Sequence, residues 1–349
     1  MKSTFVSTSA VSQAMRYQLL RAQSELTQAQ KEVSTGRHAD LGLALGSRTG
    51  QSVSFERDLE RLKGIVDTNG LASARLSSTQ DALGQISASA QSFLSTLTTS
   101  VSGDASKSLT LTDAKGTLQS LTAILNSSYN GEHLFAGINT DVEPVNDFTN
   151  PASPNKTAFD AGFLSFFGFT QNAPAAANIT AAQMNNFMDT VVEPQFLGAG
   201  WQGNWSNATD QGIESRVALN ETVQTSVSAN DQGIRKLAMA AASVAAMFDS
   251  NVGESARNAL LTRTVGLVGE AMADIANLRS QTGIVENRVK NASDRLNMQV
   301  NLFEKNILQL ESVDPYEAST RVSSLLTQIE TSYALTARIQ QLSLVKYLT

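Results

Sequence analysis

Cysteine is absent from this chain of 349 residues, so disulfides, thiol catalysis and cysteine-based metal sites are excluded. Histidine and tryptophan are scarce, with two residues each. The sequence contains no run of about 18 apolar residues and therefore predicts no membrane-spanning helix. Its first eight residues also lack the apolar stretch of a cleaved signal peptide. We therefore expect a chain that either stays in the cytoplasm or is exported without such a signal.

Positive charge and aromatic side chains are both in short supply. There are 26 Lys and Arg residues against 32 Asp and Glu residues, which gives a net charge of −6. Nucleic-acid binding needs clustered positive charge, so the balance argues against a nucleic-acid partner. Aromatic residues make up only 6% of the chain. Small and aliphatic side chains must therefore provide most of the packing, which suits contacts between helices.

The residues that usually carry chemistry form no recognisable constellation. His38 and His133 lie far apart in the sequence, and neither has a partner at the spacing of a metal site. No phosphate-binding loop or hydrolase motif is present. Trp201 and Trp205 are compatible with a sugar-stacking platform, although anchors of a buried core are the favoured interpretation. We predict no catalytic, cofactor-binding or metal-binding residues, and no cofactor.

The positions of proline divide the chain. Residues 1–143 and 195–314 contain none, which permits long uninterrupted helices. The segment 138–212 contains five of the six prolines, eight of the fourteen phenylalanines and a single basic residue, Lys156. We therefore predict an inserted outer domain at 138–212, with an aromatic core, an acidic surface and a smaller α+β or β fold.

Two apolar stripes predict very long helices on either side of this insertion. One repeats every seven residues from Phe55, and the other continues in steps of three and four from Ile275. Such spacing keeps one apolar face along a helix, as antiparallel coiled-coil pairing requires. Helices of roughly 60 and 50 Å would not fit a compact domain, so the sequence predicts a mainly α fold with a helical rod at 35–137 and 213–314. The predicted rod core comprises Phe55, Leu62, Leu76, Leu83, Leu97, Ile275, Val289, Leu296, Phe303 and Leu310.

The terminal segments 1–34 and 315–349 carry shorter apolar stripes. Isolated helices of this length and composition are marginal in water. We therefore predict two terminal coiled-coil helices that lie together and become fully ordered only among neighbouring subunits. The residues predicted to form this subunit interface are Met15, Leu19, Leu26, Val33, Leu325, Ile329, Tyr333, Ile339, Leu342, Val345 and Leu348.

Two local features depart from the helical pattern. Residues 213–227 alternate between apolar and polar positions, and Asn220 and Glu221 can form a turn, so a small hairpin is predicted there. Asn69 interrupts the first long stripe. It either sets the register of the paired helices or faces solvent.

Three motifs resemble segments of the bacterial flagellin superfamily. Residues 29–37 (AQKEVSTGR) resemble its N-terminal signature, and residues 129–137 (YNGEHLFAG) resemble the segment that closes its outgoing helices. Residues 339–348 (IQQLSLVKYL) are similar to the end of the hook-associated branch that joins hook to filament. The resemblance covers about 1–137 and 213–349. The chain departs from the family pattern after Arg37 and at His133, where an aromatic residue is usual.

The resemblance implies a structural protein of the extracellular flagellum and no enzyme. Family members leave the cell through the flagellar type III channel without a cleaved signal, and an export chaperone is expected. The terminal helices would line an inner tube, and the middle domain would face outward. The implied partners are further copies in a ring, the other hook–filament junction protein and flagellin. Neither nucleic acid nor membrane is expected to bind.

Three alternatives remain open from the sequence. The first is flagellin, the filament subunit, which belongs to the same superfamily. The second is a secreted adhesin in which the tryptophan-containing domain binds sugar and the helices form a stalk. The third is a hydrolase that uses Asp189 and Glu193, which lie four positions apart and could share one helix face.

Overall fold

The computed structural model describes residues 8–348, with side chains from residue 10 to residue 338. Its internal contacts divide the chain into two units. We call residues 1–64 together with 297–349 the terminal unit, and residues 65–296 the central unit. The two longest helices, α3 (Thr49–Val101) and α9 (Glu254–Glu311), contribute residues to both.

The predicted fold class is confirmed. Residues 8–348 are mainly helical, and the sheets found among them are two antiparallel hairpins of two strands each. The longest helices coincide with stretches that lack proline, because no residue there interrupts the helical hydrogen bonds.

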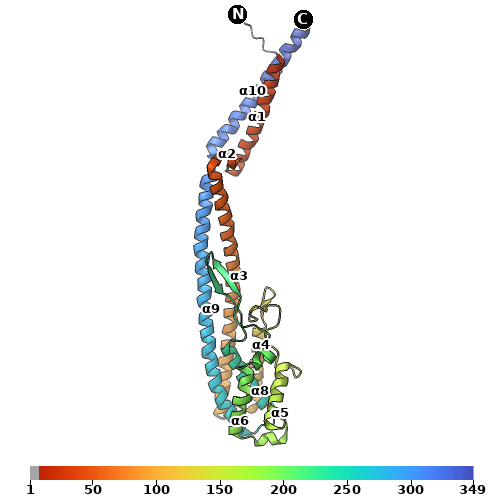
Figure 1. Ribbon diagram of the computed structural model, residues 1–349, viewed down its shortest axis with the longest axis vertical. Helices are drawn as coiled ribbons and strands as arrows, with labels where there is room; N and C mark the ends of the chain where they lie inside the picture. Colours follow the sequence, from red (N-terminus) through yellow and green to blue (C-terminus); the bar gives the residue numbers. More distant parts are fainter. Residues whose placement is uncertain (1–7, 349) are drawn as a thin grey trace. The chain divides into compact units, whose positions relative to one another are not determined.

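The terminal unit contains two helical pairs. α1 (Thr8–Thr35) lies beside α10 (Pro315–Leu348), as Figure 1 shows. The beginning of α3 lies against the end of α9, where the ring centroids of Phe55 and Phe303 are 5.5 Å apart. A short helix, α2 (Leu41–Leu45), and a 3-10 turn, η1 (Gly46–Arg48), connect α1 to α3.

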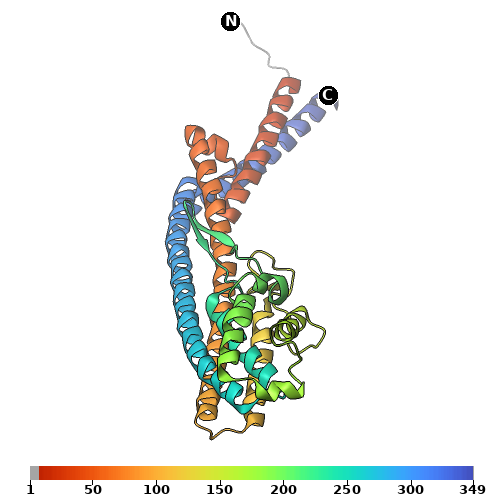
Figure 2. The same ribbon diagram turned by 60° about the horizontal axis from the view of Figure 1, so that its bottom comes forward.

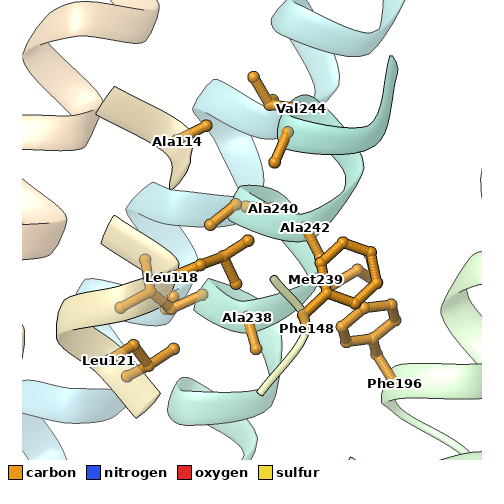
Figure 3. Packing of buried hydrophobic residues seen from close by; sticks show 14 of the residues in the cluster. Ala114, Leu118, Leu121, Phe148, Phe196, Ala238, Met239, Ala240, Ala242 and Val244 are labelled. Atoms are coloured by element: carbon orange, nitrogen blue, oxygen red, sulfur yellow. The ribbon is translucent and has the colours of Figure 1, made fainter. Parts of the chain in front are cut away.

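The central unit is built around two helices of medium length. α4 (Lys107–Leu125) packs against α8 (Gln232–Phe248), and their buried side chains interlock in Figure 3. Side-chain caps fix both starts: Ser106 accepts a hydrogen bond from the backbone of Leu109, and Asp231 accepts one from Gly233. The buried face of α8 is rich in alanine, which lets the two helices approach closely.

The aromatic segment shares this core. Its elements are α5 (Pro154–Phe167), the 3-10 turn η2 (Pro174–Asn178), α6 (Ala181–Phe187), the π-helical turn η3 (Met188–Val192), α7 (Glu193–Phe196) and the π-helical turn η4 (Trp201–Trp205). Phe148, Phe159 and Phe163 are buried in one cluster with side chains of α4 and α8. Within the described part of 138–212 the regular structure is therefore helical. The predicted boundary of an outer domain at 138–212 stays a prediction.

The hairpin predicted near 213–227 is present. Strands β3 (Glu214–Ala218) and β4 (Glu221–Gln224) pair antiparallel and lie along α3 and α9 in Figure 2. Val217 and Val223 supply its buried face and join a small apolar cluster with Leu76 and Val289 of the two helices. The hairpin is therefore docked on the helical pair by side-chain packing.

Asn69 also holds this hairpin in place. Its side chain is only 1% exposed, and its Nδ2 donates a hydrogen bond of 2.9 Å to the carbonyl oxygen of Val217. The alternative in which Asn69 faces solvent is therefore wrong. The amide of Asn69 thus bonds from within the apolar stripe to the backbone of the docked hairpin, while its Oδ1 is buried without a partner among the described residues.

A second hairpin arises from the motif at residues 129–137, where the sequence analysis predicted none. Strands β1 (Ser128–Tyr129) and β2 (Glu132–His133) pair around Asn130 and Gly131. Both turn residues have positive φ, 53° and 84°, as a type I′ turn requires. The Asn-Gly dipeptide is the strongest short signal for such a turn and marks the hairpin in the sequence.

Gly137 ends this motif in a confined, left-handed conformation. Its φ is +68°, and an added Cβ would lie 2.5 Å from the carbonyl oxygen of Thr209 and 2.6 Å from that of Gln211. Gly137→Ala is therefore expected to lower the free energy of unfolding by about 2 kcal/mol or more, because backbone strain and a backbone clash add together. Urea titration followed by circular dichroism measures the loss.

Gly131→Ala is the matched control. Gly131 has a φ of +84°, but nothing lies within 4 Å of its added Cβ. It should show the cost of the left-handed conformation alone, about 1 kcal/mol. Equal losses for the two variants would contradict the confinement of Gly137.

Leu83 tests the core of the central unit. Its side chain is fully buried on α3, whereas Leu71 on the same helix is 59% exposed. Leu83→Ala should lower the free energy of unfolding by about 2–5 kcal/mol, since it leaves a cavity, and Leu71→Ala should change it little. A thermal or denaturant melt that is the same for both variants would refute the assignment of Leu83 to the core.

Candidate assembly surface

The two histidines lie beside structural partners. Nδ1 of His133 is 2.9 Å from the carbonyl oxygen of Asn126, and Nδ1 of His38 is 3.8 Å from a carboxylate oxygen of Glu32. Within the part of the chain that the structure describes, no three His, Asp or Glu side chains come together in a way that could hold a metal ion. A metal centre therefore has no candidate among these residues.

The tryptophan pair belongs to the core. Trp201 and Trp205 are 0% and 2% exposed, and their rings stack with centroids 5.7 Å apart and planes 4° from parallel. Nε1 of Trp201 donates a hydrogen bond of 2.8 Å to Oδ1 of Asn230. A sugar platform needs an exposed ring face, so the interpretation as core anchors is confirmed.

Asp189 and Glu193 share one arginine. The two guanidinium nitrogens of Arg263 lie 2.5 Å from Asp189 and 3.1 Å from Glu193. Both carboxylates thus lie beside one permanent cation. Their spacing on a helix is explained by this ion pair, which removes the observation on which a hydrolase interpretation depended.

The contact between α1 and α10 is made mainly by small and aliphatic side chains. Ala22 and Ala29 are buried on α1, and Ala318, Leu325 and Ile329 are buried on α10. Alanine permits close approach but buries little apolar area. The pair is therefore narrow, and much of each helix surface is left outside its seam.

The residues predicted for the subunit interface fall into four groups. Leu325 and Ile329 are buried between the two helices, and Met15, Leu19 and Leu26 are half-buried. Val33 and Tyr333 are 44% and 52% exposed, and the Tyr333 hydroxyl accepts a hydrogen bond of 2.9 Å from Nε2 of Gln23. The side chains of the remaining four, Ile339, Leu342, Val345 and Leu348, lie outside the described residues.

Large apolar side chains remain exposed on both helices of the pair. Tyr17 is 82% exposed, Leu20 63% and Leu335 50%, although all three belong to a helix with an apolar seam. Single exposed hydrophobic residues are normal, whereas several along two adjacent helices leave apolar area that the pair itself does not cover. We call this series the assembly surface; it comprises Tyr17, Leu20, Val33, Leu326, Tyr333 and Leu335.

The residues predicted for the rod core lie at helix contacts in both units. In the terminal unit Leu62 is buried, and Phe55, Phe303 and Leu310 are half-buried. In the central unit Leu83, Leu97, Ile275 and Val289 are fully buried, and Leu76 and Leu296 are nearly so. The residues predicted for the rod core therefore pack at contacts between helices, and none of them belongs to the assembly surface.

None of the helices described between residues 8 and 348 is both long and apolar enough to cross a membrane. The exposed apolar series on α1 and α10 is interrupted by polar and charged positions, as in an amphipathic helix that meets another helix.

Comparison with known proteins agrees with a flagellar assembly. The model of the bacterial flagellin N-terminal helical region matches residues 6–140, and that of the C-terminal helical region matches residues 265–348. Together the two models cover well over half of the chain. A search of curated proteins finds no match.

One solved structure with a similar fold is described as a "putative flagellar hook-associated protein from Vibrio parahaemolyticus". It is 12% identical, has a TM-score of 0.52, and aligns over 75% of this chain and 96% of its own. At this identity the likeness concerns the fold.

Proposed function

We propose that this chain, which belongs to the bacterial flagellin superfamily of flagellar structural proteins, forms the junction between the hook and the filament. Members of this family are components of the extracellular flagellum and act as structural proteins. The finer assignment is to a ring at the hook tip, with the other junction protein and flagellin as its neighbours. The last residues of the chain, whose sequence resembles the hook-associated branch, support it.

The observation that carries the proposal is the assembly surface on α1 and α10. The seam between these helices consists of small and aliphatic side chains, and large apolar side chains remain exposed on both helices. Burial of apolar area contributes roughly 25 cal/mol per Å², so such a surface gains stability from neighbours that surround it. We propose that segments 1–34 and 315–349 form the inner tube, and that segments 35–137 and 213–314 form the surrounding helical layer.

Segment 138–212 is assigned to the outer face of the ring. It is strongly acidic, with Lys156 as its only basic residue, and its phenylalanine and tryptophan side chains are largely buried in the central unit. A charged surface over a closed aromatic core is what a solvent-facing part of an assembly needs. Export through the flagellar type III channel with a chaperone, and the absence of enzymatic activity, are further parts of the proposal.

Flagellin itself is the second candidate, because the matched family models describe flagellin helical regions. The two functions differ in position and copy number. Gold-labelled antibodies against the central unit, applied to intact flagella, separate them. Label confined to the hook end of each filament supports the junction, whereas label along the whole filament would assign the chain to flagellin. Label elsewhere on the cell would favour the adhesin.

A further inference from the structure

Two breaks between helices lie side by side in the terminal unit: one follows the end of α1, and the other separates α9 from α10. α1 ends before Gly36, whose φ is +68°, and α9 ends at Glu311. The backbone N–H of His38 donates to the carbonyl oxygen of Glu311 at 2.9 Å, and that of Val313 donates to the carbonyl oxygen of Gly36 at 3.0 Å. The outgoing and returning chains are thus joined by backbone hydrogen bonds at the point where both leave a helix.

Glu311 places a carboxylate at this point with no exposure to solvent. Its side chain is 0% exposed. Oε1 accepts a hydrogen bond of 2.6 Å from Oγ of Ser52, and Oε2 accepts one of 3.0 Å from Nη1 of Arg37. Arg37 follows α1, so the charge that balances the last residue of the returning helix comes from the outgoing chain.

Glu32 provides the reciprocal contact near the end of α1. Its side chain is 10% exposed. Oε1 accepts a hydrogen bond of 3.1 Å from the backbone N–H of Ala39, and Oε2 accepts one of 3.2 Å from Nη1 of Arg321. Arg321 belongs to α10, where its other nitrogen also contacts Glu317 at 2.8 Å. Each buried glutamate is therefore paired with an arginine from the opposite chain segment.

The energetics of such pairs are asymmetric. Removing one partner of a buried ion pair leaves a charge without compensation, which costs far more than removing both partners together. Exposed pairs behave differently, and their loss changes stability little. Arg21 and Glu25 on α1 form such an exposed pair, with side chains 81% and 46% exposed. At the two breaks the carboxylates of Glu311 and Glu32 are 0% and 10% exposed, whereas their partners Arg37 and Arg321 are 51% and 48% exposed, so removal of an arginine leaves a buried carboxylate without its partner.

We propose that Glu32, Arg37, Glu311 and Arg321 form a latch that positions α1 and α10 for assembly. When the latch is closed, the end of α1 and the start of α10 are held in one register, so the assembly surface is presented in one arrangement. These four are positioning residues, because they act through the helices they hold. The inference rests on the proposed function for its role in assembly, but the latch itself is a property of the monomer.

Hydrogen exchange of the full-length chain, followed by mass spectrometry, tests the latch. The variants are Arg37→Gln, Glu311→Gln and the double variant, with Arg21→Gln as the matched control. We expect Arg37→Gln to accelerate exchange in peptides spanning 36–40 and 311–318 by about tenfold or more. The double variant should exchange more slowly than Arg37→Gln, since it no longer buries an unpaired carboxylate. Peptides from 76–97 in the central unit should not change.

Several outcomes would overturn the latch. Arg37→Gln and Arg21→Gln could accelerate exchange alike, which would make the pair at Glu311 an ordinary surface contact. The double variant could exchange faster than Arg37→Gln, which would exclude an unpaired buried charge. Equal acceleration in 76–97 would indicate general destabilisation in place of a local opening.

Filament counts in cells test the positioning role separately. The fraction of hooks that carry a filament should fall several-fold with Arg37→Gln and recover in the double variant. Normal filaments in an Arg37→Gln strain that shows the expected exchange would overturn positioning for assembly. Failure of the exchange experiment removes the latch but leaves the junction function untouched, whereas gold label along the whole filament would remove the junction function and leave the latch.

Discussion

Cells whose only copy of this chain ends at Arg321 are expected to make hooks without filaments. The truncation removes 322–349, which contains Leu325 and Ile329 of the α1–α10 seam and half of the assembly surface. α1 then loses its partner, and an isolated helix of this composition is marginal in water. Electron microscopy of the cells counts the filaments, and quantification of the truncated chain outside the cell shows that it is still exported.

A pair of point variants separates loss of the surface from loss of the fold. Leu326 and Gln328 are both exposed on α10. Leu326→Asp places a carboxylate on the assembly surface, where its desolvation among neighbours would cost several kcal/mol, whereas Gln328→Asp changes a position outside that surface. The first should reduce the number of filaments at least about tenfold, and the second should leave it close to normal. Filaments of normal number on the truncated chain would disprove the role of the terminal pair.

Trp201→Ala is expected to cause the largest loss of stability in the central unit, about 3–5 kcal/mol in the free energy of unfolding. The indole is fully buried and stacked on Trp205, and the guanidinium of Arg235 lies 5.7 Å from its ring centroid. Truncation leaves a cavity and removes the donor to Asn230. Urea unfolding followed by circular dichroism measures the change, since fluorescence would itself be altered.

Two companion variants show which part of the loss comes from the cavity. Trp201→Phe keeps most of the ring volume but not the N–H group, so a loss of about 1 kcal/mol is expected; Oδ1 of Asn230 still accepts a hydrogen bond from Ser206. Tyr316→Ala removes an aromatic ring that is 86% exposed on α10 and should leave the unfolding of the central unit unchanged. A Trp201→Ala variant as stable as the parent chain would contradict the buried position of the indole.

The long helices and the larger hairpin were predictable from the sequence because each follows from a pattern that repeats along the chain. The absence of proline and the stripes that begin at Phe55 and Ile275 predict α3 and α9, since helix interiors exclude proline and helix contacts need periodic apolar residues. The alternation at 213–227 predicts the β3–β4 hairpin for the same reason. The shorter β1–β2 hairpin was missed although Asn130-Gly131 marks its turn, because its strands have only two residues each and show no alternation.

Contacts between distant residues were not predictable in this way. Arg37 and Glu311 lie 274 positions apart, and the local sequence around either residue does not predict a contact with the other. An apolar stripe also does not predict which of its residues are buried within the monomer and which remain exposed. Leu325 and Tyr333 were both predicted at the subunit interface, yet the first is 7% exposed, whereas the second is 52% exposed and contacts α1 through its hydroxyl, which accepts a hydrogen bond from Gln23.

The central claim is that neighbouring subunits cover the assembly surface, the exposed apolar side chains of α1 and α10. The absence of cysteine allows a direct measurement, since one introduced thiol is the only thiol in the chain. The Leu20→Cys variant is exposed to a maleimide reagent, first as soluble monomer and then in purified flagella. Fast modification of the monomer and strong protection in the flagellum are predicted, because Leu20 is 63% exposed before assembly. Equal rates in the two states would contradict the claim.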